Sequence, residues 1–78
     1  MLGHLLKMPF VLNMRLGTVK FYDKEKGLGL ITPSNGGTDF RFSSSGLLDP
    51  IEPNNIVLFD IHFVEKRVEA IDVKVLAS

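Results

Sequence analysis

The chain has 78 residues and a mass of 8.7 kDa, which allows a single small domain. It contains no cysteine, so disulfide bonds, thiolate metal sites and thiol nucleophiles are excluded. Nine basic and nine acidic residues give a formal net charge of zero. A strongly basic nucleic-acid binder is therefore excluded, whereas a module with a local basic face is not. The hydrophobic content of 45% is typical of a globular chain.

Residues 1–13 differ from the rest of the chain because they are almost entirely apolar, with Lys7 and Pro9 as interruptions. The run is too short to span a bilayer, and it shows no clear signal-peptide pattern. We interpret it as an apolar N-terminal extension to a domain at 14–78. Three interpretations stay open: a loosely attached or disordered extension that an upstream start adds, a segment that packs on its own domain or on a second copy in a homodimer, and a targeting segment.

From Met14 onward the apolar residues recur with a period of two, which predicts strands rather than helices. Five strands are predicted, at 16–22, 27–32, 40–43, 57–63 and 68–76. Turn-forming residues separate them, and Ser34-Asn35-Gly36-Gly37 predicts a hairpin turn because Asn-Gly suits a positive φ. Five short strands would leave exposed edges in an open sheet. We therefore predict an all-β fold, a five-stranded antiparallel OB-type barrel.

The alternation also predicts which side chains fill the barrel. The inward candidates are Val19, Ile31, Phe40, Phe42, Val57, Phe59, Ile61, Val73 and Val75. Phe40 and Phe42 are assigned to the core because the opposite register would bury Arg41 without a partner. Leu28 and Leu30 then face outward, opposite Ile31. This exposed apolar pair could bind bases, bind a protein or be covered by residues 1–13.

The charges are unevenly distributed along the chain. Residues 14–46 contain five basic and three acidic residues, whereas residues 47–78 contain three basic and six acidic residues. We therefore expect any anionic ligand to contact the first half of the domain.

Two segments resemble the motifs of the bacterial cold-shock domain. GTVKFY at 17–22 resembles G-x-V-K-W-F, and KGLGLITP at 26–33 resembles K-G-F-G-F-I-x-P. DFRFSSSGL at 39–47 falls without a gap on D-V-F-V-H-F-S-A-I, and 57–76 falls on the family's last two strands. The resemblance covers residues 15–77, and only the loop after Leu47 is shorter than in a typical member.

This resemblance implies binding of single-stranded RNA or DNA, because the family stacks bases on aromatic side chains of adjacent strands. Phe21 takes the place of the family's exposed tryptophan and would stack a base. Lys20 and Lys26 match motif lysines that can contact phosphate, and Asp39 matches an aspartate that can hydrogen-bond a base edge. The resemblance thus predicts a binding site made of Lys20, Phe21, Lys26, Leu28, Leu30, Asp39, Arg41 and Ser43.

Several of the family's stacking side chains are replaced in this chain. Leu28 and Leu30 take the places of two phenylalanines, and Arg41 takes that of a third. Ser43 replaces the motif's histidine, and Ser44 replaces its last phenylalanine. Since a stacked base is worth about 1–3 kcal/mol, we predict weak, salt-sensitive binding with little sequence preference. Arg41 compensates in part, because a guanidinium plane can stack on a base.

The same replacements support an alternative function, a cold-shock-like barrel converted to a protein-interaction or self-associating module. Enzyme activity has no support in the sequence. His4 and His62 lack companions at metal-ligand spacing, and Ser43-Ser44-Ser45 has no neighbouring histidine base. We therefore expect no catalytic residues, no cofactor, no metal and no membrane association. We expect a cytoplasmic location, which the absence of cysteine fits.

Overall fold

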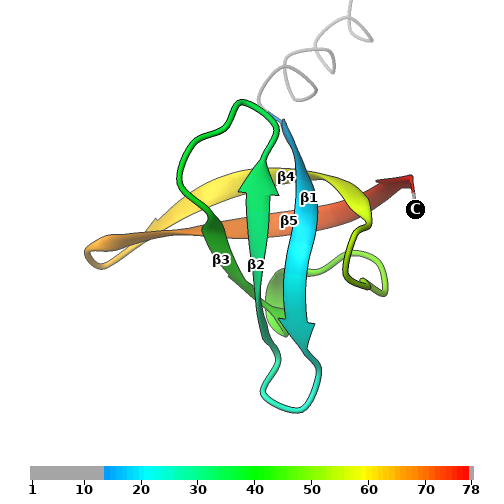
Figure 1. Cartoon of the computed structure of the whole chain (residues 1–78). Helices are drawn as coiled ribbons and strands as arrows, with labels where there is room; N and C mark the ends of the chain where they lie inside the picture. The colour runs from blue at the N-terminus through cyan, green and yellow to red at the C-terminus, as the bar shows by residue number, and fades with distance from the viewer. Residues whose placement is uncertain (1–13, 78) are drawn as a thin grey trace, which may run out of the picture.

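The computed structural model describes residues 14–77, so the predicted apolar extension at 1–13 lies outside the described residues. The described chain forms five strands (Figure 1), which are β1 (Arg15–Asp23), β2 (Leu28–Pro33), β3 (Phe40–Ser43), β4 (Ile56–Val64) and β5 (Arg67–Ala77). A short 3-10 helix, η2 (Ser44–Gly46), follows β3. All five predicted strands are confirmed, and their ends agree with the predicted ends to within one residue.

The strands close into a barrel in the order β1-β2-β3-β5-β4. Four of the neighbouring pairs are antiparallel, but β3 and β5 run parallel, with Arg41 beside Glu69 and Phe42 beside Ala70. The prediction of a barrel is confirmed, and the prediction that it is purely antiparallel is wrong. The reason is the odd number of strands, because strand directions cannot alternate all the way around a closed ring of five.

The core lies inside this ring and consists mainly of β-branched and aromatic side chains. The buried hydrophobic residues are Val19, Ile31, Phe42, Ile51, Val57, Phe59, Ala70 and Val73. Six of the nine predicted core residues are among them, whereas Phe40, Ile61 and Val75 are only partly buried against the cluster. Ile51 and Ala70 were not predicted. Ile51 lies in the loop before β4, where no alternation marks an inward position.

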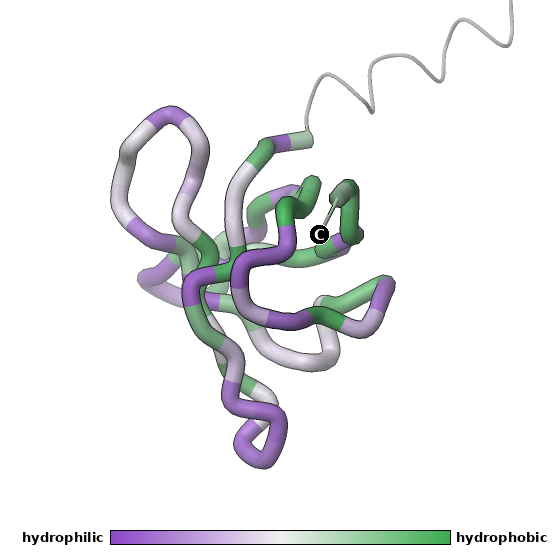
Figure 2. The backbone as a smooth tube through the Cα atoms, turned by 45° about the vertical axis from the view of Figure 1, so that its right-hand side comes forward, coloured by the Kyte–Doolittle hydropathy of each residue, from purple (hydrophilic) through white to green (hydrophobic). Residues whose placement is uncertain are grey.

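The turn between β1 and β2 is held by one carboxylate. Asp23 Oδ1 accepts hydrogen bonds from the backbone N–H groups of Glu25 (3.1 Å) and Lys26 (3.2 Å). Gly27 closes the turn at a φ of 68° and donates its N–H to the backbone oxygen of Asp23. Such a positive φ favours glycine. The result is a tight, hydrophilic turn at the lower end of the molecule (Figure 2).

The connection between β2 and β3 contains the predicted turn in a different geometry. The N–H of Gly36 donates to the backbone oxygen of Pro33 (3.1 Å), and Asn35 Oδ1 accepts the N–H of Gly37 (3.0 Å). The positive φ, 84°, falls on Gly36, and Asn35 has none. The Asn-Gly pair therefore begins a longer loop over residues 34–39 rather than a two-residue hairpin turn.

Candidate functional site

An irregularity in β1 decides which of its side chains face solvent. Val19 pairs with Ile31 and Phe21 pairs with Leu30, so Lys20 is an extra residue between two consecutive cross-strand pairs. This is a β-bulge. It turns both Lys20 and Phe21 outward, and 47% of Phe21 is exposed. Tyr22 then returns to the interior, where its ring lies 5.4 Å from that of Phe42.

The outer face of β1, β2 and β3 carries two short cross-strand rows. Leu30 lies between Phe21 and Arg41 in the first row. In the second row, Leu28 lies between Asp23 and Ser43. We call the side chains of Phe21, Leu28, Leu30, Arg41 and Ser43 the outer platform. Phe21, Leu28 and Arg41 are exposed, whereas Leu30 and Ser43 are half-buried. Leu28 and Leu30 thus lie on the outer face, as the alternation predicts.

Beside the outer platform, Lys20 and Asp39 form an ion pair. Lys20 Nζ donates to Asp39 Oδ2 at 3.0 Å. This contact lowers the pKa of the Asp39 carboxyl below its ordinary value of 3.8, and the side chain of Thr32 contributes in the same direction. Asp39, the predicted hydrogen-bond acceptor for a base, and Lys20, a predicted phosphate contact, are therefore already paired with each other.

The remaining cations of the predicted site, Lys26 and Arg41, make no ion pair with any residue in the described range 14–77. Lys26 is exposed in the turn after β1, and Arg41 is exposed on β3. The cross-strand neighbour of Arg41 is Glu69, whose carboxylate accepts from Arg67 Nε at 3.2 Å. Both cations can therefore meet an anionic ligand without first breaking an ion pair.

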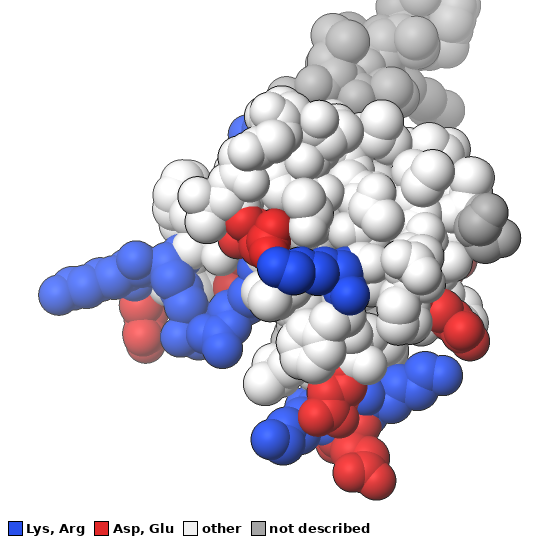
Figure 3. Space-filling view, in the orientation of Figure 1, with Lys and Arg blue, Asp and Glu red and all other residues white. Residues whose placement is uncertain are grey.

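The charges around the platform alternate in sign. Figure 3, in which the viewer faces β1 and β2, shows basic and acidic side chains next to each other at the lower and left margins and in the middle of this face. The described part of the face thus has separate cationic side chains with acidic side chains and uncharged surface between them. Such a surface attracts anions at short range only.

Similarity to known proteins identifies the family. No protein-family model matches the chain. It is 34% identical over 68 residues to the cold shock-like protein CspG of Shewanella violacea, covering 82% of this chain and 97% of that protein. The chain belongs to the cold-shock family. It is also 52% identical over 35 residues to cold shock domain-containing protein 4 of Arabidopsis thaliana, across 45% of this chain and 17% of that protein.

The solved structure of Drosophila Unr CSD456 agrees with this membership. It superposes with a TM-score of 0.69 at 26% identity, over 81% of this chain and 26% of the other. The chain thus spans a minor part of the Arabidopsis and Drosophila proteins and nearly the full length of CspG. In this cold-shock domain the outer platform lies on the outer side of β1, β2 and β3.

Three further features of the domain were not predicted from its sequence. The bulge at Lys20 interrupts the period of two, so no pattern in the sequence marks it. The ion pair joins Lys20 of β1 to Asp39 of the 34–39 loop, which are distant in sequence. Phe63, near the end of the β4–β5 hairpin, is 72% exposed, although its place in the alternation is that of an inward residue. The end of the β4–β5 hairpin extends past β3 (Figure 1), so an inward-type side chain there has no core to enter.

Two further observations concern the described residues only. Between residues 14 and 77, no helix has the length and apolar character needed to cross a membrane. Over the same range, the histidine and carboxylate side chains form no group of three or more that could hold a metal ion.

Proposed function

We propose that this cold-shock domain binds single-stranded RNA or DNA on the outer platform, weakly and with little sequence preference. The observation that carries the proposal is the outward position of Phe21 in a member of this family, on the same face as the exposed Arg41 and Leu28. An exposed aromatic ring offers a flat face to any base, so stacking on it is tolerant of sequence.

The low affinity that we propose follows from the small number of aromatic rings on the platform. The platform has one aromatic ring, that of Phe21, where the family typically stacks bases on several. Leu28 and Leu30 still offer apolar surface but no π-face. With about 1–3 kcal/mol for each stacked base, the loss of two or more faces lowers the affinity by at least about tenfold. Arg41 recovers a part of this through its guanidinium plane.

Binding of this kind needs no chemical step. A protein that binds the unpaired strand and not the duplex shifts the equilibrium toward the unpaired state by mass action. Keeping RNA unpaired is the work that we propose for this domain, in the cytoplasm and without a cofactor.

The experiment is a chemical-shift titration of the full chain with an oligo-U or oligo-dT strand at low salt. We expect shifts at Phe21, Leu28, Leu30 and Arg41. Phe21→Ala should weaken binding by about fivefold or more, because the single stacking face is removed. Phe63→Ala is the matched control, since it removes an exposed phenylalanine that lies off the platform.

Tight binding that is insensitive to salt would contradict the proposed weakness. An equal loss in the Phe21→Ala and Phe63→Ala variants would contradict the proposed location.

A second candidate function rests on the exposure of Leu28, 39%, next to the half-buried Leu30. Two outward leucines in place of stacking rings suit contact with another protein or with a second copy, including a homodimer through residues 1–13. Sedimentation of the full chain over a range of concentrations separates the two functions. A stable dimer together with no strand binding at low salt would favour this second candidate.

A further inference from the structure

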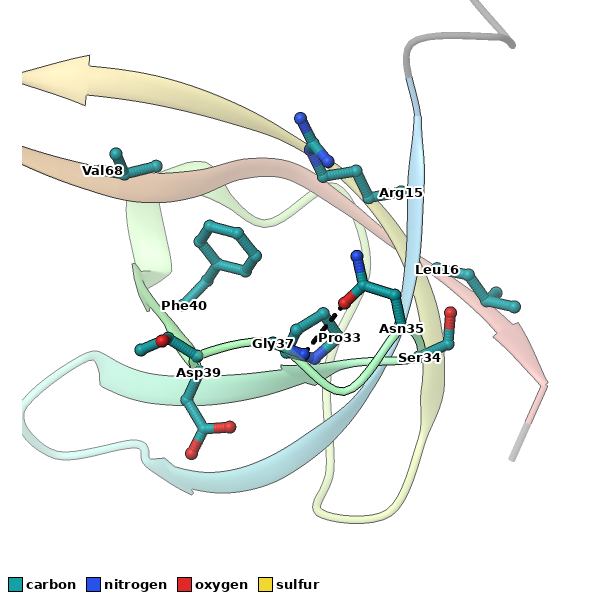
Figure 4. Close-up of a pocket in the computed structure, with 10 residues that line it drawn as sticks. Arg15, Leu16, Pro33, Ser34, Asn35, Gly37, Asp39, Phe40 and Val68 are labelled. Carbon is teal, nitrogen blue, oxygen red and sulfur yellow. Dashed lines mark hydrogen bonds between the residues drawn. The ribbon is translucent and has the colours of Figure 1, made fainter.

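A hollow of about 580 Å³ lies at one end of the barrel, apart from the outer platform. It is bounded by the start of β1, the 34–39 loop and the start of β5 (Figure 4). Phe40 points into it, with Val68 on one side and Pro33 and Asn35 on the other. Because Phe40 and Arg41 are consecutive strand residues, their side chains point to opposite faces of β3. The hollow and the platform therefore lie on opposite faces of β3, and they adjoin at Asp39, which lines the hollow and pairs with Lys20 beside the platform.

The floor of the hollow is apolar. One side of the Phe40 ring packs on Phe59, with ring centroids 5.5 Å apart, and Phe40 is only partly buried. Val68 pairs directly across the hairpin with Phe63, which is 72% exposed. The uncovered apolar surface thus continues from the hollow along the β4–β5 hairpin. Surface of this kind usually has a partner.

The start of β1 at the rim of the hollow indicates what that partner is. Arg15 and Leu16 line the hollow, and they follow Met14 directly. The thirteen residues before Met14 are therefore attached at the rim. They are almost entirely apolar and contain no acidic residue. An extended chain of this length reaches about 40 Å, so chain length does not limit access to the hollow.

We propose that residues 1–13 fold back within the same chain and cover this hollow, with apolar side chains over Phe40 and Val68. Attachment at the rim makes docking intramolecular, which gives the segment a high effective concentration at its site. The docked segment shields the exposed surface of the β4–β5 hairpin and leaves the platform open. This inference does not depend on strand binding by the platform, since it concerns another face of the barrel, and it is an alternative to a homodimer through residues 1–13.

The test uses the natural absence of cysteine from the chain. One full-length variant carries Phe10→Cys and Thr38→Cys, and its matched control carries Phe10→Cys and Thr18→Cys. Both threonines are exposed, but only Thr38 lines the hollow. Thr18 is nearer to Phe10 along the chain, so a loose segment would react with position 18 at least as fast. With oxidised glutathione as the oxidant, we expect an intrachain disulfide that forms several-fold faster at position 38.

Equal or faster closure at position 18 would overturn the proposal. So would disulfides that link two chains in preference to one, because the occupant would then be a second copy.

A second measurement avoids the introduced cysteines. In the full chain, Phe10→Ser should move the NMR signals of the Val68 methyl groups and the Thr38 amide, and leave those of the Leu28 methyl groups in place. Unchanged signals at Val68 and Thr38, or a larger change at Leu28, would show that the segment does not cover the hollow.

Discussion

The Lys20–Asp39 ion pair makes one contribution to stability depend on pH. Because Lys20 lowers the pKa of Asp39 below its ordinary value of 3.8, folded Asp39 keeps its charge at a lower pH than unfolded Asp39. The stabilisation is therefore fully present above the unfolded pKa and is lost as the pH falls through the folded pKa. Since the pair is exposed, its contribution is small.

We expect Asp39→Asn to be slightly less stable than the natural chain near neutral pH, and this difference to shrink as the pH falls below about 4. Thermal unfolding of both proteins from about pH 6 to about pH 3 measures the effect. A difference that is constant over this range would contradict the role of the ion pair.

At the scale of the element, β2 packs closely against its neighbours through Gly29. A Cβ atom at this position would lie 2.5 Å from the backbone oxygen of Phe21 and closer still to the ring of Phe42. Neither a strand backbone nor a core ring can move away easily. We expect Gly29→Ala to destabilise the fold by about 2 kcal/mol, a fall in Tm of roughly 10 °C.

Gly37→Ala is the matched control for Gly29→Ala. Its Cβ would lie 3.3 Å from the side chain of Asn35 in a solvent-exposed loop. We expect a change of at most about 0.5 kcal/mol. Equal losses in the two variants would show that β2 is not closely packed at Gly29.

A substitution on the outer face of β2 should raise the affinity for single strands. Leu30 lies between Phe21 and Arg41, so a ring at this position would extend the stacking surface across two strands. We expect Leu30→Phe to tighten binding of an oligo-U strand by roughly tenfold, from one added stacked base. Leu58→Phe is the control, because Leu58 is a half-buried leucine of β4 beside Leu16. A similar gain from both variants would indicate non-specific apolar binding.

The strands could be predicted from the sequence because each follows a period of two between clear turn signals. The bulge could not, since a single extra residue at Lys20 interrupts the alternation that would reveal it. Strict alternation would place Phe21 on the same side as Val19, inside the barrel. Only the resemblance to the cold-shock motifs placed Phe21 outside, and the bulge is the physical reason that it lies there.

At the scale of the whole molecule, closure of the barrel determines features that the local alternation of apolar residues does not specify. An odd number of strands in a closed ring requires at least one parallel pair, here β3–β5, and Ile51 in the loop before β4 is buried in the core cluster. The contact between Lys20 and Asp39 depends on how the 34–39 loop returns to β3. These features involve residues that are distant in sequence, so no local window predicts them.

Because the molecule has no net charge, we expect few phosphate contacts, and their number predicts how strongly binding depends on salt concentration. For single strands, the logarithm of the binding constant falls with the logarithm of salt concentration by about 0.7 for each phosphate neutralised. Lys26 and Arg41 make no ion pair within residues 14–77, whereas Lys20 must first leave Asp39. Two or three phosphate contacts give a slope between about −1.4 and about −2.1.

Lys26→Gln should reduce the steepness of this slope by about 0.7. Lys74→Gln, which removes the same charge from the outer side of β5 beside Leu58, should leave the slope unchanged. Oligo-U titrations of the three proteins at several salt concentrations measure these slopes. If Lys74→Gln reduced the slope as much as Lys26→Gln, the strand would be bound by overall charge, and the platform would have no special part in binding.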